Sequence, residues 1–276
     1  MKAHALALIL IAFTAAASAA GTAHIIVTDP VQVTIGEGGI VDLGVVGPGQ
    51  RIEIEISTAS GYADFRGIEE YWDRMYVLPE SLPRGWTSQD SLFYERKMKA
   101  FVIVPKDAYD GEYGFSLQAV EEYTGPQPLS FRAKVKVTRD VLKFDVLQDS
   151  VGSGVDQPAV YTLQLSNTGS ASDAFEIEVT KGLPAAWTFK KRVFVPHNSV
   201  KRMQYEVIAA DQGEFTVTFN ALSISSDLIR GTDTAELVAR SSLWEDMKAA
   251  SRGVLLFPSI EQAVYSLIGL IASNSG

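Results

Sequence analysis

Apolar and polar residues alternate with a period of two along much of the chain. Ile52, Ile54 and Ile56 alternate with glutamates, and a second run alternates from Phe131 to Val137. Every second side chain of a β-strand points to the same face of its sheet, so these runs predict strands with one buried face. The same alternation recurs at Tyr161–Leu165, Phe175–Val179, Met203–Val207 and Phe215–Phe219.

Turn signals separate these runs. Gly47–Gly49, Asn167–Gly169 and Asp211–Gly213 combine glycine with proline, asparagine or aspartate, the residues that favour tight turns. Short alternating strands with such turns between them are typical of antiparallel β-sandwiches. We therefore predict an all-β fold.

A repeat within the sequence indicates two copies of the sandwich. Leu82–Thr87 recurs as Leu183–Thr188, with Leu-Pro and Trp at the same positions, and Gly111–Tyr113 recurs as Gly213–Phe215. Two landmarks that repeat at nearly the same spacing indicate that one structural unit occurs twice.

The repeat sets the predicted domain organisation. We expect two tandem immunoglobulin-like β-sandwiches, at residues 25–140 and 141–238. Each copy places a tryptophan after Leu-Pro-x-x, and these two rings, Trp86 and Trp187, are expected to fill equivalent structural positions between the sheets.

Four segments of the second copy form a set that is known from other domains. They are Leu163–Gly169, Asp173 with Phe175, Gly182–Trp187 and Gly213–Phe215. On these segments the copy resembles the NEW3 and CARDB group of immunoglobulin-like modules, whereas the first copy lacks the Asn-x-Gly turn. Such modules are accessory domains of surface proteins and carbohydrate-active enzymes, so the resemblance implies a domain without catalytic residues.

Residues 1–20 have the order of a secretory signal peptide. Lys2 precedes an apolar run from Ala5 to Phe13, and small residues follow up to Gly21. We predict a signal peptide that is cleaved after Ala19 or Ala20, and hence an extracytoplasmic protein that is secreted or held at the cell surface. Left uncleaved, the same run would serve as an N-terminal membrane anchor.

Charge and reactive residues narrow the functional classes. Asp and Glu outnumber Lys and Arg by 33 to 24, and the formal charge of −9 argues against nucleic-acid binding. The chain has no cysteine, which excludes disulfides and cysteine-based zinc sites. Beyond the signal peptide, His24 and His197 are too far apart in a repeat-based layout to suggest a pair. We predict a protein that is not an enzyme and uses no cofactor or metal.

Carboxylates offer the remaining chemistry. Glu69–Glu70 and Glu121–Glu122 are adjacent in the sequence and would diverge on a strand, which favours solvated faces over an acid-base pair. The junction between the copies carries Asp140, Asp145, Asp149 and Asp156. This junction is interpreted as a hydrated linker, with an oxygen-ligand calcium site as the alternative.

The first copy holds additional residues between its Ile-rich strand and Trp86. The excess falls within Gly61–Tyr76, where aromatic residues are interleaved with charges. Such loops provide contact area at little conformational cost, so this segment is a candidate binding loop. Its candidate contact residues are Tyr62, Phe65, Tyr71, Trp72, Arg74 and Tyr76. In the alternative interpretation, these rings fold back and cap an open end of the sandwich.

Residues 241–276 change in character from strand to helix. A predicted amphipathic helix carries one apolar stripe, formed by Ile260, Val264, Leu267, Ile268 and Ile271. Pro258 and Glu261 disfavour a transmembrane span. The stripe is therefore expected to contact a membrane surface or a protein partner, with docking on the second sandwich as a further alternative.

These patterns favour an extracytoplasmic, membrane-proximal binding or scaffold protein that presents immunoglobulin-like domains to a protein partner. The alternative is a carbohydrate-binding accessory module of the cell surface. That module would bind glycans by stacking sugar rings on Trp72, Tyr71 and Tyr62.

Overall fold

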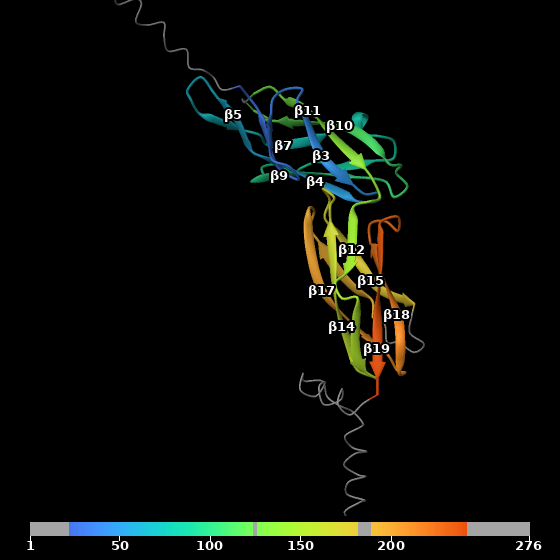
Figure 1. Ribbon diagram of the computed structural model, residues 1–276. Coiled ribbons are helices and arrows are strands. Elements are labelled where there is room, and N and C mark those ends of the chain that lie inside the picture. The colour runs from blue at the N-terminus through green and yellow to red at the C-terminus, as the bar shows by residue number, and fades with distance from the viewer. Residues whose placement is uncertain (1–21, 124–125, 182–188, 242–276) are drawn as a thin grey trace, which may run out of the picture. The chain divides into compact units, whose positions relative to one another are not determined.

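The computed structural model describes residues 22–123, 126–181 and 189–241 (Figure 1). These residues form two compact units. Of the described residues, unit 1 holds those up to Val141 together with Asn167–Asp173 and Pro196–Asn198, and unit 2 holds the others. The described chain is nearly all β-structure, and the one helical element within it is the 3-10 turn η1 (Pro79–Ser81).

Two sheets face each other in unit 1. Their strand orders are β2-β1-β4-β9-β8 and β3-β11-β10-β7. The strands are β1 (Ile25–Asp29), β2 (Val33–Ile35), β3 (Ile40–Val46), β4 (Arg51–Ser57), β7 (Arg74–Val77), β8 (Thr87–Gln89), β9 (Lys97–Ile103), β10 (Gly111–Val120) and β11 (Leu129–Val137). The series β1-β4-β9-β8 and β7-β10-β11 follow the A-B-E-D and C-F-G orders of an immunoglobulin sandwich.

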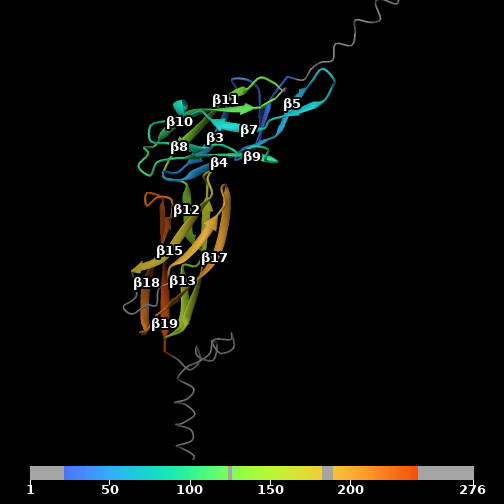
Figure 2. The same cartoon turned by 180° about the vertical axis from the view of Figure 1, so that it is seen from behind.

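Unit 2 has a related topology, in which β16 pairs with β15 whereas β8 of unit 1 pairs with β9 (Figure 2). Its sheets have the orders β12-β14-β17 and β13-β19-β18-β15-β16. The strands are β12 (Leu142–Val146), β13 (Ser150–Gly154), β14 (Pro158–Asn167), β15 (Asp173–Lys181), β16 (Lys191–Val195), β17 (Ser199–Ile208), β18 (Gly213–Ser223) and β19 (Arg230–Arg240). In each unit an early strand pairs in parallel with the last one, β3 with β11 and β13 with β19. Both units are thus immunoglobulin-like β-sandwiches.

The cores follow from the alternation in the sequence. Ile52, Ile54 and Ile56 are fully buried on β4, and the apolar residues of β11 from Phe131 to Val137 are buried as well. The repeated Gly-Glu-aromatic triplets open β10 and β18, which occupy the same place in their sheets. Trp86 lies in the core of unit 1, with its ring centroid 5.2 Å from that of Tyr113. Trp187 lies outside the described residues.

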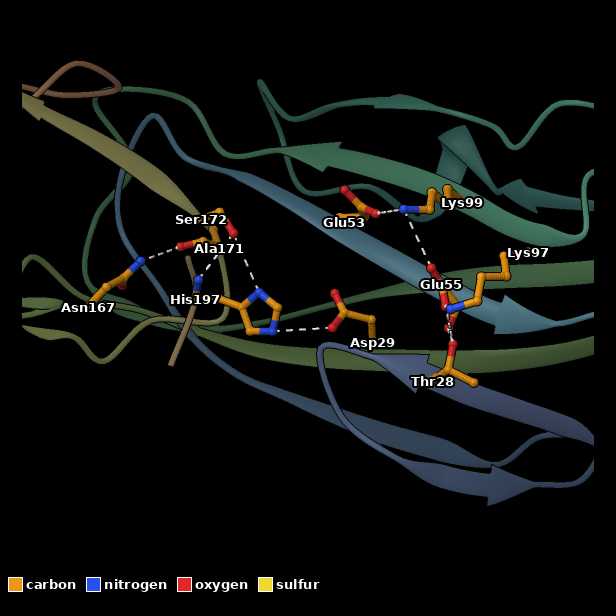
Figure 3. A network of polar contacts seen from close by, with 10 residues as sticks. All are labelled: Thr28, Asp29, Glu53, Glu55, Lys97, Lys99, Asn167, Ala171, Ser172 and His197. Carbon is orange, nitrogen blue, oxygen red and sulfur yellow. Dashed lines mark hydrogen bonds and ion pairs between the residues drawn. The ribbon is translucent and has the colours of Figure 1, made fainter. Parts of the chain in front are cut away.

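A polar network covers the outer face of β4 and β9 (Figure 3). Glu55 is buried, and its Oε1 accepts hydrogen bonds from Lys97 Nζ and Thr28 Oγ1, each at 2.8 Å. Burial by itself would raise the pKa of the Glu55 carboxyl, but these hydrogen bonds and the charges of Lys97 and Lys99 outweigh it and lower the pKa. The ionised carboxylate is therefore part of the folded structure.

His197 joins the same face of unit 1. Its Nε2 lies 3.2 Å from Asp29 Oδ1, and its backbone N–H donates to Ser172 Oγ at 3.1 Å. Burial raises the pKa of Asp29, whereas the charge of His197 acts in the opposite direction. Ser172 Oγ lies 3.5 Å from His197 Nδ1, at the outer limit of hydrogen bonding. Because this hydroxyl accepts the His197 backbone N–H, the group holds the chain around His197 in place.

The two chain ends carry predictions that the structure does not address. The signal peptide and the amphipathic tail, with its stripe from Ile260 to Ile271, lie outside the described residues. Within the described ranges, no helix is long and apolar enough to cross a membrane.

Candidate functional site: the loop end of unit 1

Three connections lie at one end of the unit 1 sandwich. They are residues 58–73 between β4 and β7, residues 90–96 between β8 and β9, and the described residues 121–123 and 126–128 of the connection between β10 and β11. The strand register places them together, because Ser57 pairs with Lys97 and Val120 pairs with Arg74. We call this set of connections the loop end. In immunoglobulin variable domains, the B–C and F–G loops at the corresponding end bind ligands.

The first connection forms a β-hairpin of its own. It pairs β5 (Ala59–Ala63) with β6 (Glu69–Tyr71), and Figure 1 shows β5 at the edge of unit 1. At its tip, Asp64 Oδ1 accepts the backbone N–H groups of Arg66 and Ile68, at 2.8 and 2.9 Å. The bond from Ile68, aided by those from Arg66, lowers the pKa of the Asp64 carboxyl. An ionised Asp64 thus orders the turn.

This ordered tip presents apolar side chains to solvent. Phe65 is 91% exposed, Ile68 is exposed beside it, and Tyr71 is 50% exposed. An aromatic ring that is almost completely exposed on an ordered turn gains from burial against a partner without a large ordering cost. The hairpin therefore has the properties of a contact element.

Trp72 points the other way. It is 1% exposed, and its Nε1 donates to the backbone oxygen of His24 at 3.1 Å. The backbone N–H of His24 in turn donates to the Ser60 oxygen at 2.8 Å. Gly61 has a positive φ of 67°, and a Cβ on it would overlap the His24 ring. Trp72 and the segment at His24 thus hold the base of the hairpin.

A second group of aromatic side chains comes from the other two connections. Leu92, Phe93 and Tyr94 are exposed between β8 and β9, and Tyr123 is 78% exposed after β10. The Tyr94 backbone N–H donates to the oxygen of Asp73 at 3.1 Å, which ties this loop to the base of the hairpin. A hydrogen bond with Tyr123 raises the pKa of the Tyr94 hydroxyl, and Glu122 adds to the effect. Three separate loops are therefore joined at one surface.

Arg74 lies between two of these rings. Its guanidinium carbon is 4.4 Å from the centroid of Phe93 and 4.5 Å from that of Tyr76. Its Nη2 lies 3.6 Å from Asp90 Oδ2. Contacts with two rings and an ion pair hold this side chain, so Arg74 supports the aromatic surface.

The predicted candidate residues divide into three kinds. Phe65 and Tyr71 are exposed, whereas Tyr62, Arg74 and Tyr76 are partly buried. The structure corrects the prediction for Trp72. We expected it among the contact residues, but its ring is buried because the hairpin base needs an apolar filler with one N–H donor. The binding-loop and capping interpretations therefore both describe part of the segment.

Sequence reasoning missed the residues outside the hairpin. Leu92, Phe93 and Tyr94 stand between two short strands, and Tyr123 follows β10. Three consecutive large apolar residues without strand alternation were the available signal for the first group.

No three His, Asp or Glu side chains in the described parts of the chain are grouped so that they could hold a metal ion.

Comparisons with known proteins give the fold a context. No protein-family profile matches the sequence, and no curated protein matches it. Among solved structures, a chimeric titin Z1Z2 carrying an exogenous KLER peptide from decorin is 17% identical, with a TM-score of 0.34, and the match covers 80% of this chain and 99% of that one. The D00-D0 domain of intimin is 12% identical, with a TM-score of 0.26 and coverage of 78% and 99%.

A third similar structure belongs to a much longer protein. It is an H294Q variant of an endo-fucoidan hydrolase of glycoside hydrolase family 107, 14% identical, with a TM-score of 0.34. The match covers 75% of this chain and 28% of the hydrolase. These likenesses concern the β-sandwich fold, and at such TM-scores they support no functional argument.

Proposed function

We propose that this chain is an extracytoplasmic, membrane-proximal binding or scaffold protein without catalytic activity, and that the loop end of unit 1 contacts a protein partner. The observation that carries the proposal is the gathering of exposed apolar side chains on three loops at one end of a rigid sandwich. The most exposed members of this set are Phe65, Leu92, Tyr94 and Tyr123. Exposed apolar surface that is gathered in one place is a mark of interaction sites.

The composition of the loop end supports a protein partner. Tyrosine, phenylalanine and arginine are enriched where binding energy concentrates, because rigid rings bury much area at little entropic cost. Arg74, held between Phe93 and Tyr76, adds the planar cation that such sites favour. The N-terminal signal-like run and the apolar stripe of the tail support the location outside the cytoplasm and near a membrane. Membership of the NEW3 and CARDB group is part of the same proposal.

The glycan alternative is weaker than the sequence suggested. It relied on Trp72 as the largest stacking platform, and this ring is buried. Tyr71 remains exposed, so a glycan array probed with the full chain separates the two alternatives. Saturable binding that disappears on Tyr71→Ala would support the accessory-module function, and its absence supports the protein partner.

Site-specific photo-crosslinking in the cells that make the protein tests the proposal. A benzoylphenylalanine side chain placed at Phe65 or at Leu92 is expected to give one discrete protein adduct. The control position is Phe194, which is 59% exposed on β16 of unit 2. An adduct pattern that is the same from Phe194, or no adduct from either loop position, would contradict a protein contact at the loop end. Protease treatment of intact cells tests the location independently.

A further inference from the structure

We propose that the loop end recognises a basic segment of its partner, with lysine or arginine side chains bound at two tyrosine-glutamate pairs around the apolar surface. This inference rests on the proposed function, because it names the chemistry of the partner at the same site. Three observations carry it: the charge of the loops, the geometry of the two pairs, and the order of the hairpin.

Carboxylates dominate the charge of the loop end. The three connections contain the acidic residues Asp64, Glu69, Glu70, Asp73, Asp90, Glu95, Glu121 and Glu122, and the basic residues Arg66 and Arg96. Arg66 is already paired with Asp64, at 2.7 Å, and Asp90 is paired with Arg74 at the start of β7, at 3.6 Å, so the surplus comes from the other carboxylates. A surface with this surplus repels phosphates and sulfates and attracts cationic groups.

Two of these carboxylates each stand beside an exposed ring. The Tyr71 hydroxyl donates to Glu69 Oε2 at 3.2 Å, and the Tyr94 hydroxyl donates to Glu122 Oε2, also at 3.2 Å. Glu69 and Glu122 are exposed as well. Each pair offers a carboxylate and an aromatic face to the same ligand. A guanidinium or ammonium group is the ligand that uses both, through an ion pair and a cation–π contact.

The loops that carry the pairs are held together. The Glu122 backbone N–H donates to Asp73 Oδ2 at 3.0 Å, and Asp73 also accepts the Tyr94 N–H through its backbone oxygen. Asp64 orders the hairpin that carries Tyr71 and Glu69. The two pairs therefore come from loops that hydrogen bonds already fix at the loop end, where Phe65 and Leu92 are also exposed. Such preorganisation reduces the entropy lost on binding.

The same observations disfavour other occupants. An anionic membrane or a sulfated glycan would face the carboxylates directly. A neutral lipid surface would accept Phe65 and Leu92 but would leave the acidic rim without partners. A protein segment with apolar and basic residues satisfies both parts of the surface.

Selection from a random dodecapeptide library displayed on phage tests the inference. The full chain is the bait, with a Phe65→Ser, Leu92→Ser double variant and a Phe194→Ser control beside it. We expect peptides that are enriched in Lys or Arg together with apolar residues. They should bind the control like the unchanged protein and bind the double variant at least about tenfold more weakly. Circular dichroism and urea unfolding verify that all three proteins are folded.

Charge-neutral variants then test the two pairs. Combining Glu69→Gln with Glu122→Gln should weaken binding of a selected peptide about tenfold and flatten its dependence on NaCl, because the ion pairs are lost. The matched control is Glu214→Gln, an exposed carboxylate on β18 of unit 2, which should change neither. Equal effects of the two changes would overturn the role of the pairs.

The outcomes separate the inference from the proposed function. Peptides that need Phe65 and Leu92 but carry no excess of Lys or Arg would overturn the basic partner and leave a protein partner in place. Peptides that bind the double variant like the unchanged protein, or no selected peptides at all, would overturn both. Loop-end-dependent binding to phosphatidylcholine vesicles in place of peptides would assign the surface to lipid and would likewise overturn both.

Discussion

The B–C connections of the two sandwiches differ in length and in structure. In unit 1 the connection runs from Thr58 to Asp73, forms the β5–β6 hairpin and exposes Phe65. In the second copy it runs from Thr168 to Ser172, as a short turn between β14 and β15. Asn167 spans this turn, since its Oδ1 accepts the Gly169 N–H and its Nδ2 donates to the Ala171 oxygen.

The difference shows how one fold supports two uses of the same connection. The short turn is hydrogen-bonded to itself, and Ser170 and Ala171 in it are buried. Additional residues in the first copy form an independent hairpin, which is fixed at its base by Trp72 and can therefore present side chains at its tip. Loop length thus decides whether this position contributes to stability or to recognition.

The strongest test of this comparison contrasts two neighbouring rings. Trp72→Ala should lower the free energy of unfolding by about 3–5 kcal/mol, because a fully buried ring and its hydrogen bond to His24 are lost. Tyr71→Ala should change it far less, because this ring is half exposed. Urea unfolding of the full chain measures both. Similar losses in the two variants would contradict the division between a buried base and an exposed contact surface.

The short turn provides the second test. Asn167→Ala should cost about 2 kcal/mol, because it removes the hydrogen bonds to Gly169 and Ala171 and leaves buried backbone groups without partners. Gln212→Ala in the exposed turn before β18 is the control and should be nearly neutral. If both variants unfold at the urea concentration of the unchanged protein, the turn is not the stabilising element that its hydrogen bonds indicate.

A pH titration tests the sheet that supports the hairpin. The pKa of Glu55 lies below the value of 4.5 expected for an unfolded chain, so its contribution to stability is present above pH 4.5 and is lost as the pH falls through the folded pKa. Glu55→Gln should cost about 1 kcal/mol at neutral pH, a modest effect because Lys97 is largely exposed. The variant should also lose less stability on acidification. If the variant loses as much stability on acidification as the unchanged protein, other carboxyls cause that loss.

The smallest expected effect concerns the hairpin tip. Asp64→Ala should leave the urea midpoint of global unfolding nearly unchanged, yet it should speed hydrogen exchange of the Arg66 and Ile68 amides. The carboxylate that accepts both N–H groups would be gone, and the turn would open locally. Unchanged exchange at these two amides would mean that the hairpin orders its tip without Asp64.

The sequence predicted the strands better than the site, for a physical reason. Burial on β4 and β11 follows from alternation within a few residues, which is local information. The repeat also located the hairpin segment through its excess length. The orientation of Tyr71 and Trp72 was not predictable, because it depends on the segment at His24, which accepts the Trp72 Nε1 hydrogen bond and is distant in sequence.

The rest of the site depends on strand pairing. Tyr94 and Tyr123 belong to loops that are distant in sequence, and they meet because β7 pairs with β10 and β4 pairs with β9. Alternation predicts that strands exist but not which strands are neighbours. A surface assembled from three connections therefore becomes visible only with the topology.

The parallel strand pairs give each sandwich a direction of mechanical strength. β3 and β11 run the same way, from Ile40 beside Arg132 to Val46 beside Val137, and β13 and β19 repeat this arrangement. The incoming end of the first strand and the outgoing end of the last strand thus lie at opposite ends of each ladder. A pull along the chain slides these strands past each other and loads their hydrogen bonds together, instead of opening them one after another. A protein that holds a partner while tethered elsewhere would resist tension through these two ladders.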